Sequence, residues 1–184
     1  MLDNLALLAP ATDAAGHLPG PLGLRLDEEF IPLTALHASK SDLDDLVPFG
    51  QRHADGHHTW LRLWPDMLWV SGTPPTGEFA SVDIRHAHTR LRLRGVEALH
   101  FLADYSSADM NDAAVRTAKV LRTRIGHYGV VLWWNSTRDI HVMLDRSLAQ
   151  SFCDHLRALS LRHDPSDPTT HPRSVSPTAP ERRG

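Results

Sequence analysis

A chain of 184 residues with 41 % hydrophobic and 22 % charged residues has the length and composition of one soluble globular domain. Its formal net charge of −3 excludes the strongly basic surface of a nucleic-acid-binding domain, and no apolar run approaches the roughly 20 residues of a membrane-spanning helix. The N-terminus is not typical of a signal peptide, and Cys153 as the single cysteine excludes an internal disulfide, so the sequence predicts a cytoplasmic protein without nucleic-acid or membrane partners.

The first half of the chain predicts short strands and one short helix. Residues 1–21, rich in Pro, Gly and Ala, read as an irregular N-terminal arm before a single domain over 22–161. Two alternating runs, "LGLRL" (22–26) and "FIPLTALH" (30–37), predict strands, and Pro32 favours a sheet edge for the second.

A helix and a hairpin are predicted next. "SDLDDLVPF" (41–49) begins with Ser41 three residues before Asp44, which indicates a helix start. "TWLRLWPDMLWVSG" (59–72) has two apolar runs about a Pro65–Asp66 turn, which is typical of a β-hairpin.

The second half predicts the order strand, helix, strand, strand, strand, helix. One strand covers "VDIRHAHTRLRLRG" (82–95), and the stripe Val96, Leu99, Phe101, Leu102 and Tyr105 indicates a helix. Further strands follow at 115–125, 129–134 and 139–144. The last helix starts near Ser147 and buries Leu148, Phe152, Leu156 and Leu159. The expected fold class is α+β, a mainly antiparallel sheet with helices on one face. Residues 162–184, rich in Pro and poor in apolar residues, are expected to be a disordered tail.

Arginines at alternate positions form the first candidate site. Arg90, Arg92 and Arg94 share one face of a predicted strand, and Arg122 and Arg124 share a face of a later one. If the two strands were neighbours, the like charges would repel unless anions lay between them. The first three arginines are therefore either a solvated face with interleaved Asp side chains or contacts for an anionic ligand or an acidic protein surface.

Tryptophans form the second candidate. Trp60 and Trp64 are predicted to flank Arg62 on one strand face, while "MLWV" and "VVLWW" are apolar on both faces. Strands apolar on both faces must be covered on both sides, either by a sheet-on-sheet core or by a partner protein. Since Trp is typical of interface hot spots, five residues are candidate partner contacts: Trp60, Trp64, Trp69, Trp133 and Trp134.

The other reactive side chains form no self-contained active site. His86 and His88 could share a strand face, and "HADGHH" adds His53, His57 and His58, but the carboxylate that would complete a metal site is missing after His88. Cys153 lies within a helix beside its apolar stripe, so we expect an inert thiol. Asp83 is either a general base or a buried structural carboxylate whose loss costs about 1–2 kcal/mol of stability. No catalytic, metal-binding or cofactor-binding residue is predicted.

Three segments between residues 59 and 160 resemble the gamma subunit of heterotetrameric sarcosine oxidase. They are "LRLWPDMLWVSG", "VDIRHAHTRLRLRGVEALHFLADYSSADM" and "AKVLRTRIGHYGVVLWWNSTRDIHVMLDRSLAQSFCDHLRAL", in the family's order. Met67 stands where the family usually has an acid, and residues 1–50 and the tail match poorly. A gamma-like chain also occurs in N-methylglutamate dehydrogenase, which leaves the substrate open.

The resemblance implies an accessory subunit with part of the architecture of the folate-dependent aminomethyltransferases. In such a complex, which demethylates sarcosine oxidatively to glycine, the other subunits carry the cofactors: large alpha-type and beta-type subunits hold FAD, FMN, NAD and tetrahydrofolate, and a small delta-type subunit holds zinc. "GHYGVVLWW" lacks the acid that aminomethyltransferases place before a comparable strand. The favoured hypothesis is therefore a non-catalytic subunit. The alternative is a stand-alone folate or one-carbon-binding protein with Asp83 and the arginines at an anion-binding pocket. A His-rich metal-binding module is a third and more distant alternative.

Overall fold

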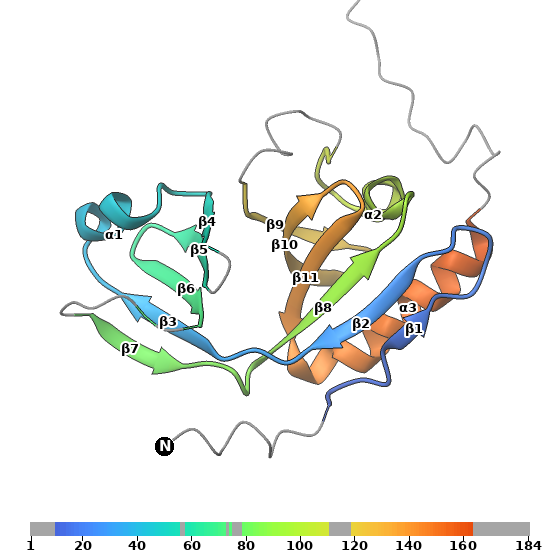
Figure 1. Ribbon diagram of the computed structural model, residues 1–184, viewed down its shortest axis with the longest axis horizontal. Coiled ribbons are helices and arrows are strands. Elements are labelled where there is room, and N and C mark those ends of the chain that lie inside the picture. Colours follow the sequence, from blue (N-terminus) through green and yellow to red (C-terminus); the bar gives the residue numbers. More distant parts are fainter. Residues whose placement is uncertain (1–9, 56–57, 73, 75–78, 111–118, 164–184) are drawn as a thin grey trace, which may run out of the picture.

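The computed structural model describes residues 10–55, 58–72, 74, 79–110 and 119–163, which form an α+β fold with two antiparallel sheets (Figure 1). The first sheet has six strands, in the spatial order β1 (Ala15–His17), β2 (Arg25–Glu29), β8 (His88–Arg94), β11 (Asp139–Asp145), β10 (Tyr128–Ser136) and β9 (Leu121–Ile125). The second has five, in the order β4 (Arg52–Ala54), β5 (Thr59–Trp64), β6 (Met67–Ser71), β3 (Leu33–His37) and β7 (Ala80–Asp83).

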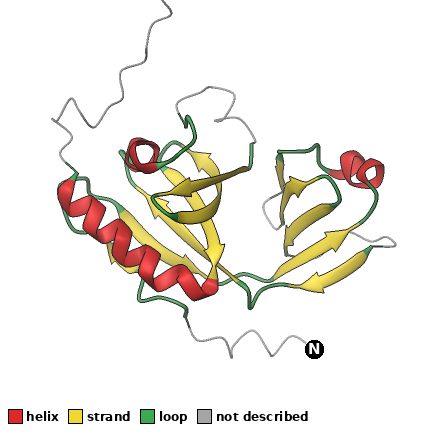
Figure 2. Ribbon diagram, turned by 180° about the vertical axis from the view of Figure 1, so that it is seen from behind, coloured by secondary structure: helices red, strands yellow, loops and turns green. Residues whose placement is uncertain are grey.

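Helices cover the outer face of each sheet. Figure 2 shows α3 (Ala149–Arg162) lying along the six-stranded sheet, and α2 (Ala98–Tyr105) packs on the same face. Their apolar stripes, which include Phe101, Phe152 and Leu156, are buried against alternate residues of β8, β10 and β11. On the five-stranded sheet, α1 (Lys40–Leu46) buries Leu43 against Leu68 and Val70. No helix in the described ranges is long and apolar enough to cross a membrane.

The two inner faces pack on each other and form a separate core. Val131, Trp133 and Met143 of the six-stranded sheet meet Leu61 and Trp69 of the five-stranded sheet there. Helices cover one face of strand β10 and a second sheet covers the other. This accounts for the apolar residues on both of its faces. The sequence left open whether a sheet-on-sheet core or a partner protein covers these apolar strands, and the structure contains the sheet-on-sheet core.

The α+β class and the antiparallel pairing are confirmed, as is the 59–72 hairpin. The single strand predicted over 82–95 is wrong. Strand β7 ends at Asp83, Ile84 to Ala87 form a turn, and β8 starts at His88 in the other sheet. Alternation of apolar and polar residues continues through the turn, so the pattern did not reveal that the chain changes sheet.

Several element ends also differ from the prediction. The cap of α1 is Ser39, whose Oγ accepts a hydrogen bond from the Asp42 backbone N–H at 3.2 Å, in place of Ser41. Val96 and Leu148 are exposed, since α2 begins after the first and a 3-10 turn (Arg146–Leu148) precedes α3.

The predicted arm and tail lie partly outside the described residues. The arm includes strand β1, which pairs with β2. At the other end Arg162 closes α3, and the remainder of the predicted tail from residue 164 onwards is among the residues that the structure does not describe.

Candidate functional site

The inner face of the six-stranded sheet brings the candidate residues together in rows. Antiparallel register places Arg90 opposite Met143 and Met143 opposite Val131, which in turn pairs with Arg122. A neighbouring row begins with His88 opposite Asp145 and ends with Gly129 opposite Arg124. One end of this face is polar, the middle is the sheet-on-sheet core, and the other end opens into a cleft.

The polar end contains the predicted arginine ladder, here Arg90, Arg92 and Arg94. Each guanidinium is paired with an acidic side chain of a neighbouring strand. Arg90 contacts Glu29 at 2.9 Å, Arg92 contacts Glu29 at 3.1 Å and Asp139 at 2.6 Å, and Arg94 contacts Asp27. The geometry is therefore that of interleaved acids, and contact of the ladder with an external anion stays a prediction.

These contacts lower the pKa values of the three acids. Burial alone would raise the pKa of Glu29, but the contact with His141 at 3.4 Å, the charge of Arg90 and the hydrogen bond from Arg92 outweigh it and bring the pKa to about 2. The hydrogen bond from Arg92 lowers the pKa of Asp139 to about 2, and that from Arg25 does the same for Asp27. At neutral pH these carboxylates are ionised, and their weak basicity makes them poor proton acceptors.

The arginine ladder and its acidic partners are part of a polar network that connects the two sheets. His141 stacks on Trp133 with ring centroids 5.0 Å apart, and Asn135 Nδ2 lies 2.9 Å from Asp139 Oδ2. Arg52 of β4 donates from Nη1 to Asn135 Oδ1 at 2.8 Å. Residues of both sheets thus belong to one polar network at this end of the interface.

Arg122 and Arg124 lie apart from the ladder. Strands β10 and β11 separate β9 from β8, so the predicted repulsion between neighbouring arginine rows does not arise. The Arg122 guanidinium carbon lies 4.6 Å from the centre of the Trp64 ring, which is a cation–π contact.

Most of the tryptophans proposed as partner contacts are buried within the chain itself. Trp133 is 1 % exposed, and Trp69 and Trp134 are each 6 % exposed. The physical reason given for a partner, uncovered apolar strand faces, therefore does not hold for these three residues. The partner interface as such stays a prediction, and Trp60 and Trp64 are its more accessible candidates.

Trp60 and Trp64 do not share a face as predicted. The register of β5 shifts between Arg62 and Trp64, and this bulge turns Trp64 towards the core between the sheets. Trp60 packs on the opposite face, beside the core under α1. Arg62, between them, is fully buried, which the sequence did not predict.

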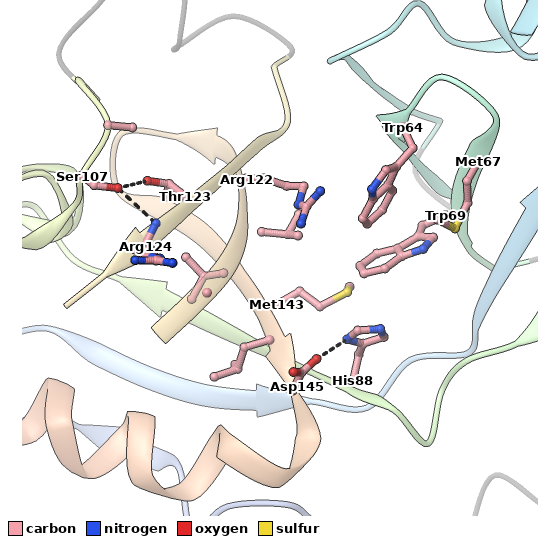
Figure 3. A pocket seen from close by; sticks show the side chains of 15 residues that line it. Trp64, Met67, Trp69, His88, Ser107, Arg122, Thr123, Arg124, Met143 and Asp145 are labelled. Atoms are coloured by element: carbon pink, nitrogen blue, oxygen red, sulfur yellow. Dashed lines mark hydrogen bonds and ion pairs between the residues drawn. The ribbon is translucent and has the colours of Figure 1, made fainter. Parts of the chain in front are cut away.

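The cleft between the sheets has a volume of about 1030 Å³ (Figure 3). Trp64, Met67 and Trp69 form its wall on the five-stranded sheet. Arg122, Arg124 and Gly129 line the opposite side, and Figure 3 shows the Arg122 guanidinium directed towards Trp64. This is a cavity large enough for a small molecule.

The remaining sequence candidates lie apart. Asp83 is on edge strand β7, where its side chain pairs with Arg85, whose hydrogen bond lowers the pKa of the carboxyl group. The Cys153 thiol is fully buried, and burial raises its pKa to about 11, as an inert thiol requires.

The described histidines among those singled out from the sequence do not form one cluster. His86 is exposed in the turn after β7, whereas His88 faces the cleft and lies 3.7 Å from Asp145. His53 packs against Trp60, His58 contacts Asp55, and His57 lies outside the described residues. Within the described ranges no group of three or more His, Cys, Asp or Glu side chains could hold a metal ion.

Because Asp83 is 44 % exposed, Asp83→Asn is expected to change the free energy of unfolding by less than about 0.5 kcal/mol. This replaces the cost of about 1–2 kcal/mol estimated from the sequence for a buried carboxylate. Urea unfolding of the parent protein and of the Asp83→Asn variant provides the measurement. A loss above about 1 kcal/mol would contradict the exposed position of this side chain.

Two of the acids that neutralise the ladder, Asp27 and Glu29, were missed because the first predicted strand ended at residue 26. In "RLDEE" (25–29), Arg25, Asp27 and Glu29 alternate with Leu26, which is the signal of a half-buried strand. A strand extended by three residues would have offered Asp27 and Glu29 as counter-ions for a neighbouring arginine strand.

Neither the known protein-family models nor the curated protein sequences match this chain. A solved structure does: a chain of the heterotetrameric sarcosine oxidase from Corynebacterium sp. U-96 in complex with pyrrole 2-carboxylate. The TM-score is 0.66 at 16 % sequence identity, and the alignment covers 78 % of this chain and 87 % of that chain. The similarity establishes a shared fold.

Proposed function

We propose that this chain is the gamma-type, non-catalytic subunit of a sarcosine-oxidase-like flavoenzyme complex. The observation that carries this proposal is the extent of the fold similarity, which spans 87 % of a chain in a heterotetrameric sarcosine oxidase. The three segments that resemble the gamma subunit, together covering most of residues 61–159, include β10, β11 and most of helix α3. Fold and sequence pattern thus favour the same family.

The chemistry of the described side chains supports a non-catalytic role for this chain. Glu29, Asp27 and Asp139 are ion-paired with arginines and have pKa values of about 2, so they are unsuited to accept a proton at neutral pH. Cys153 is buried with a raised pKa. Asp83 lies on β7 and is absent from the lining of the cleft, so the alternative of a folate pocket built from Asp83 and the ladder has no geometric support.

In this proposal the reaction takes place on the partner subunits. Large alpha-type and beta-type subunits would bind FAD, FMN, NAD and tetrahydrofolate, and a small delta-type subunit would bind zinc, in the cytoplasm. The complex would demethylate sarcosine to glycine and transfer the one-carbon unit to tetrahydrofolate. N-methylglutamate is the alternative substrate, and the larger subunits would determine which of the two is used.

Co-expression tests the proposal. We expect that this chain, produced with the large flavin-type subunits of a sarcosine-oxidase-like complex, elutes with them in one complex, and that omission of this chain lowers the yield of assembled complex. Produced alone, the chain is expected to be colourless and free of stoichiometric zinc after gel filtration. A flavin retained by the isolated chain, or large subunits that assemble equally well without it, would contradict the accessory role.

A further inference from the structure

We propose that the cleft between the two sheets is a binding site for a planar aromatic anion. At about 1030 Å³ it is at the upper end of the range of small-molecule pockets, which is roughly 300–1,000 Å³. The proposal rests on three features of the cleft: a bare floor, an aromatic wall, and positive charge that no carboxylate of the described residues pairs with.

The floor of the cleft is the backbone of Gly129. This glycine lies within β10, two residues before Val131, whose side chain enters the core between the sheets. Gly129 is absent from the glycines with positive φ, so its backbone does not require glycine. A Cβ atom added there would meet nothing within 4 Å. A glycine inside a strand marks a place where another group approaches the backbone closely, and here a flat ring could lie on the peptide plane.

The wall opposite the floor is aromatic. Trp64 and Trp69 lie with ring centroids 5.2 Å apart, and Trp69 is 4.5 Å from His88 (Figure 3). Met67 and Met143 add polarisable apolar surface beside them. Such surfaces favour an aromatic group between the wall and the floor.

The charge of the cleft favours an anion. Arg122 and Arg124 lie on one side of Gly129, and within the described residues neither guanidinium contacts a carboxylate, in contrast to the three arginines of the ladder. Next to Arg124, the hydroxyl groups of Ser107 and Thr123 lie 3.0 Å apart. Guanidinium and hydroxyl donors suit a carboxylate or a phosphate group. The acid of the cleft, Asp145, lies near His88 on the other side, so the anionic group of the ligand belongs at the arginine side.

Naphthalene probes test the site and distinguish the two kinds of anion. 2-Naphthoate and 2-naphthyl phosphate are titrated into the full chain, followed by tryptophan fluorescence and by calorimetry, with 2-naphthol as the neutral control. We expect saturable binding of at least one anion, with quenching of tryptophan emission, and binding of 2-naphthol weaker by about tenfold because it lacks the charge-assisted hydrogen bonds. Equal binding of all three probes would overturn the proposal.

Variants locate the binding. Gly129→Phe places a strand-compatible side chain on the open floor, so the chain should fold as before and bind the anion at least about tenfold more weakly. Arg122→Gln and Arg124→Gln should each weaken binding by about tenfold. Arg94→Gln is the matched control. It removes an arginine whose charge is already paired at the far end of the same face, and it should change the affinity by less than about twofold.

Thermal unfolding shows whether each variant is folded, and Gly129→Ala provides a smaller blocking group if the phenylalanine variant is not. Unchanged anion binding by a folded Gly129→Phe variant would contradict the site. If that variant instead loses co-elution with the large subunits, the cleft is a protein docking surface, and the proposal of a small-molecule site is wrong.

Discussion

Arg62→Ala is expected to lower the free energy of unfolding by about 3–5 kcal/mol, the largest effect of any single substitution considered for this chain. Arg62 is 0 % exposed. Its Nε donates to the Trp64 carbonyl oxygen at 2.7 Å, and its Nη2 donates to the carbonyl oxygens of Pro65 and of Lys40, the latter at 3.4 Å. The same Nη2 lies 3.3 Å from Asp44 of α1. One buried side chain therefore joins the β5–β6 turn to α1.

Alanine at position 62 leaves a cavity and removes the donors that bond the three carbonyl groups, which are two separate costs. Arg62→Met keeps most of the side-chain volume and loses the hydrogen-bond donors, so it separates the cost of the cavity from the cost of the lost hydrogen bonds. Asp44→Asn is the matched control for the ion pair. Because Asp44 is 39 % exposed, its substitution should cost less than about 1 kcal/mol. Urea unfolding monitored by circular dichroism measures all three, and a loss below about 1 kcal/mol for Arg62→Ala would contradict this view of Arg62.

The second large effect is a loss of stability at acid pH through the ladder acids. Folding lowers the pKa of Glu29 from 4.5 to about 2. A carboxyl group with a lowered pKa stabilises the folded state above its unfolded pKa, and this contribution is lost as the pH falls through the folded value. At 1.36 kcal/mol per pKa unit, Glu29 alone should contribute about 3 kcal/mol at pH 7 that disappears between about pH 5 and pH 2. Asp139 and Asp27 titrate in the same window.

Glu29→Gln tests this assignment. The variant should be less stable than the parent at pH 7, and its stability should depend less steeply on pH between about 5 and 2 because one of the three ladder acids is gone. Asp154→Asn, on the exposed side of α3, is the control for loss of a surface carboxylate and should change the stability at pH 7 by less than about 0.5 kcal/mol. Urea midpoints measured at intervals of pH provide the comparison. An identical pH slope in Glu29→Gln and the parent would contradict the role of the ladder acids.

The parts of the fold that the sequence predicted are those with strong local signals. The Pro65–Asp66 turn between two apolar runs fixes the 59–72 hairpin, and helical spacing places Phe152 and Leu156 on the buried side of α3. The predicted facing of Trp64 was wrong because a local irregularity interrupts the strand alternation. The bulge between Arg62 and Trp64 is invisible in the alternation of "TWLRLW", so the facing of Trp64 could not be read from it.

The candidate site depended on contacts between distant segments, which local patterns do not contain. Burial of Trp133 requires the five-stranded sheet, whose strands begin about 100 residues earlier. Pairing of Arg92 with Glu29 and Asp139 likewise depends on strand order in the sheet. Gly129 is visible in the sequence "HYGVV", but the sequence does not show that this glycine lines a cleft.

The accessory role is tested most directly by isolating the native complex through a tag on this chain and recording flavin reduction after anaerobic addition of sarcosine. We expect flavin-bearing large subunits to co-elute with the tagged chain, and sarcosine to bleach the flavin absorbance faster than N-methylglutamate does. Faster reduction by N-methylglutamate would keep the accessory role and change the substrate. Recovery of this chain without flavin-bearing partners, or of partners whose flavin neither amino acid reduces, would contradict the proposed function.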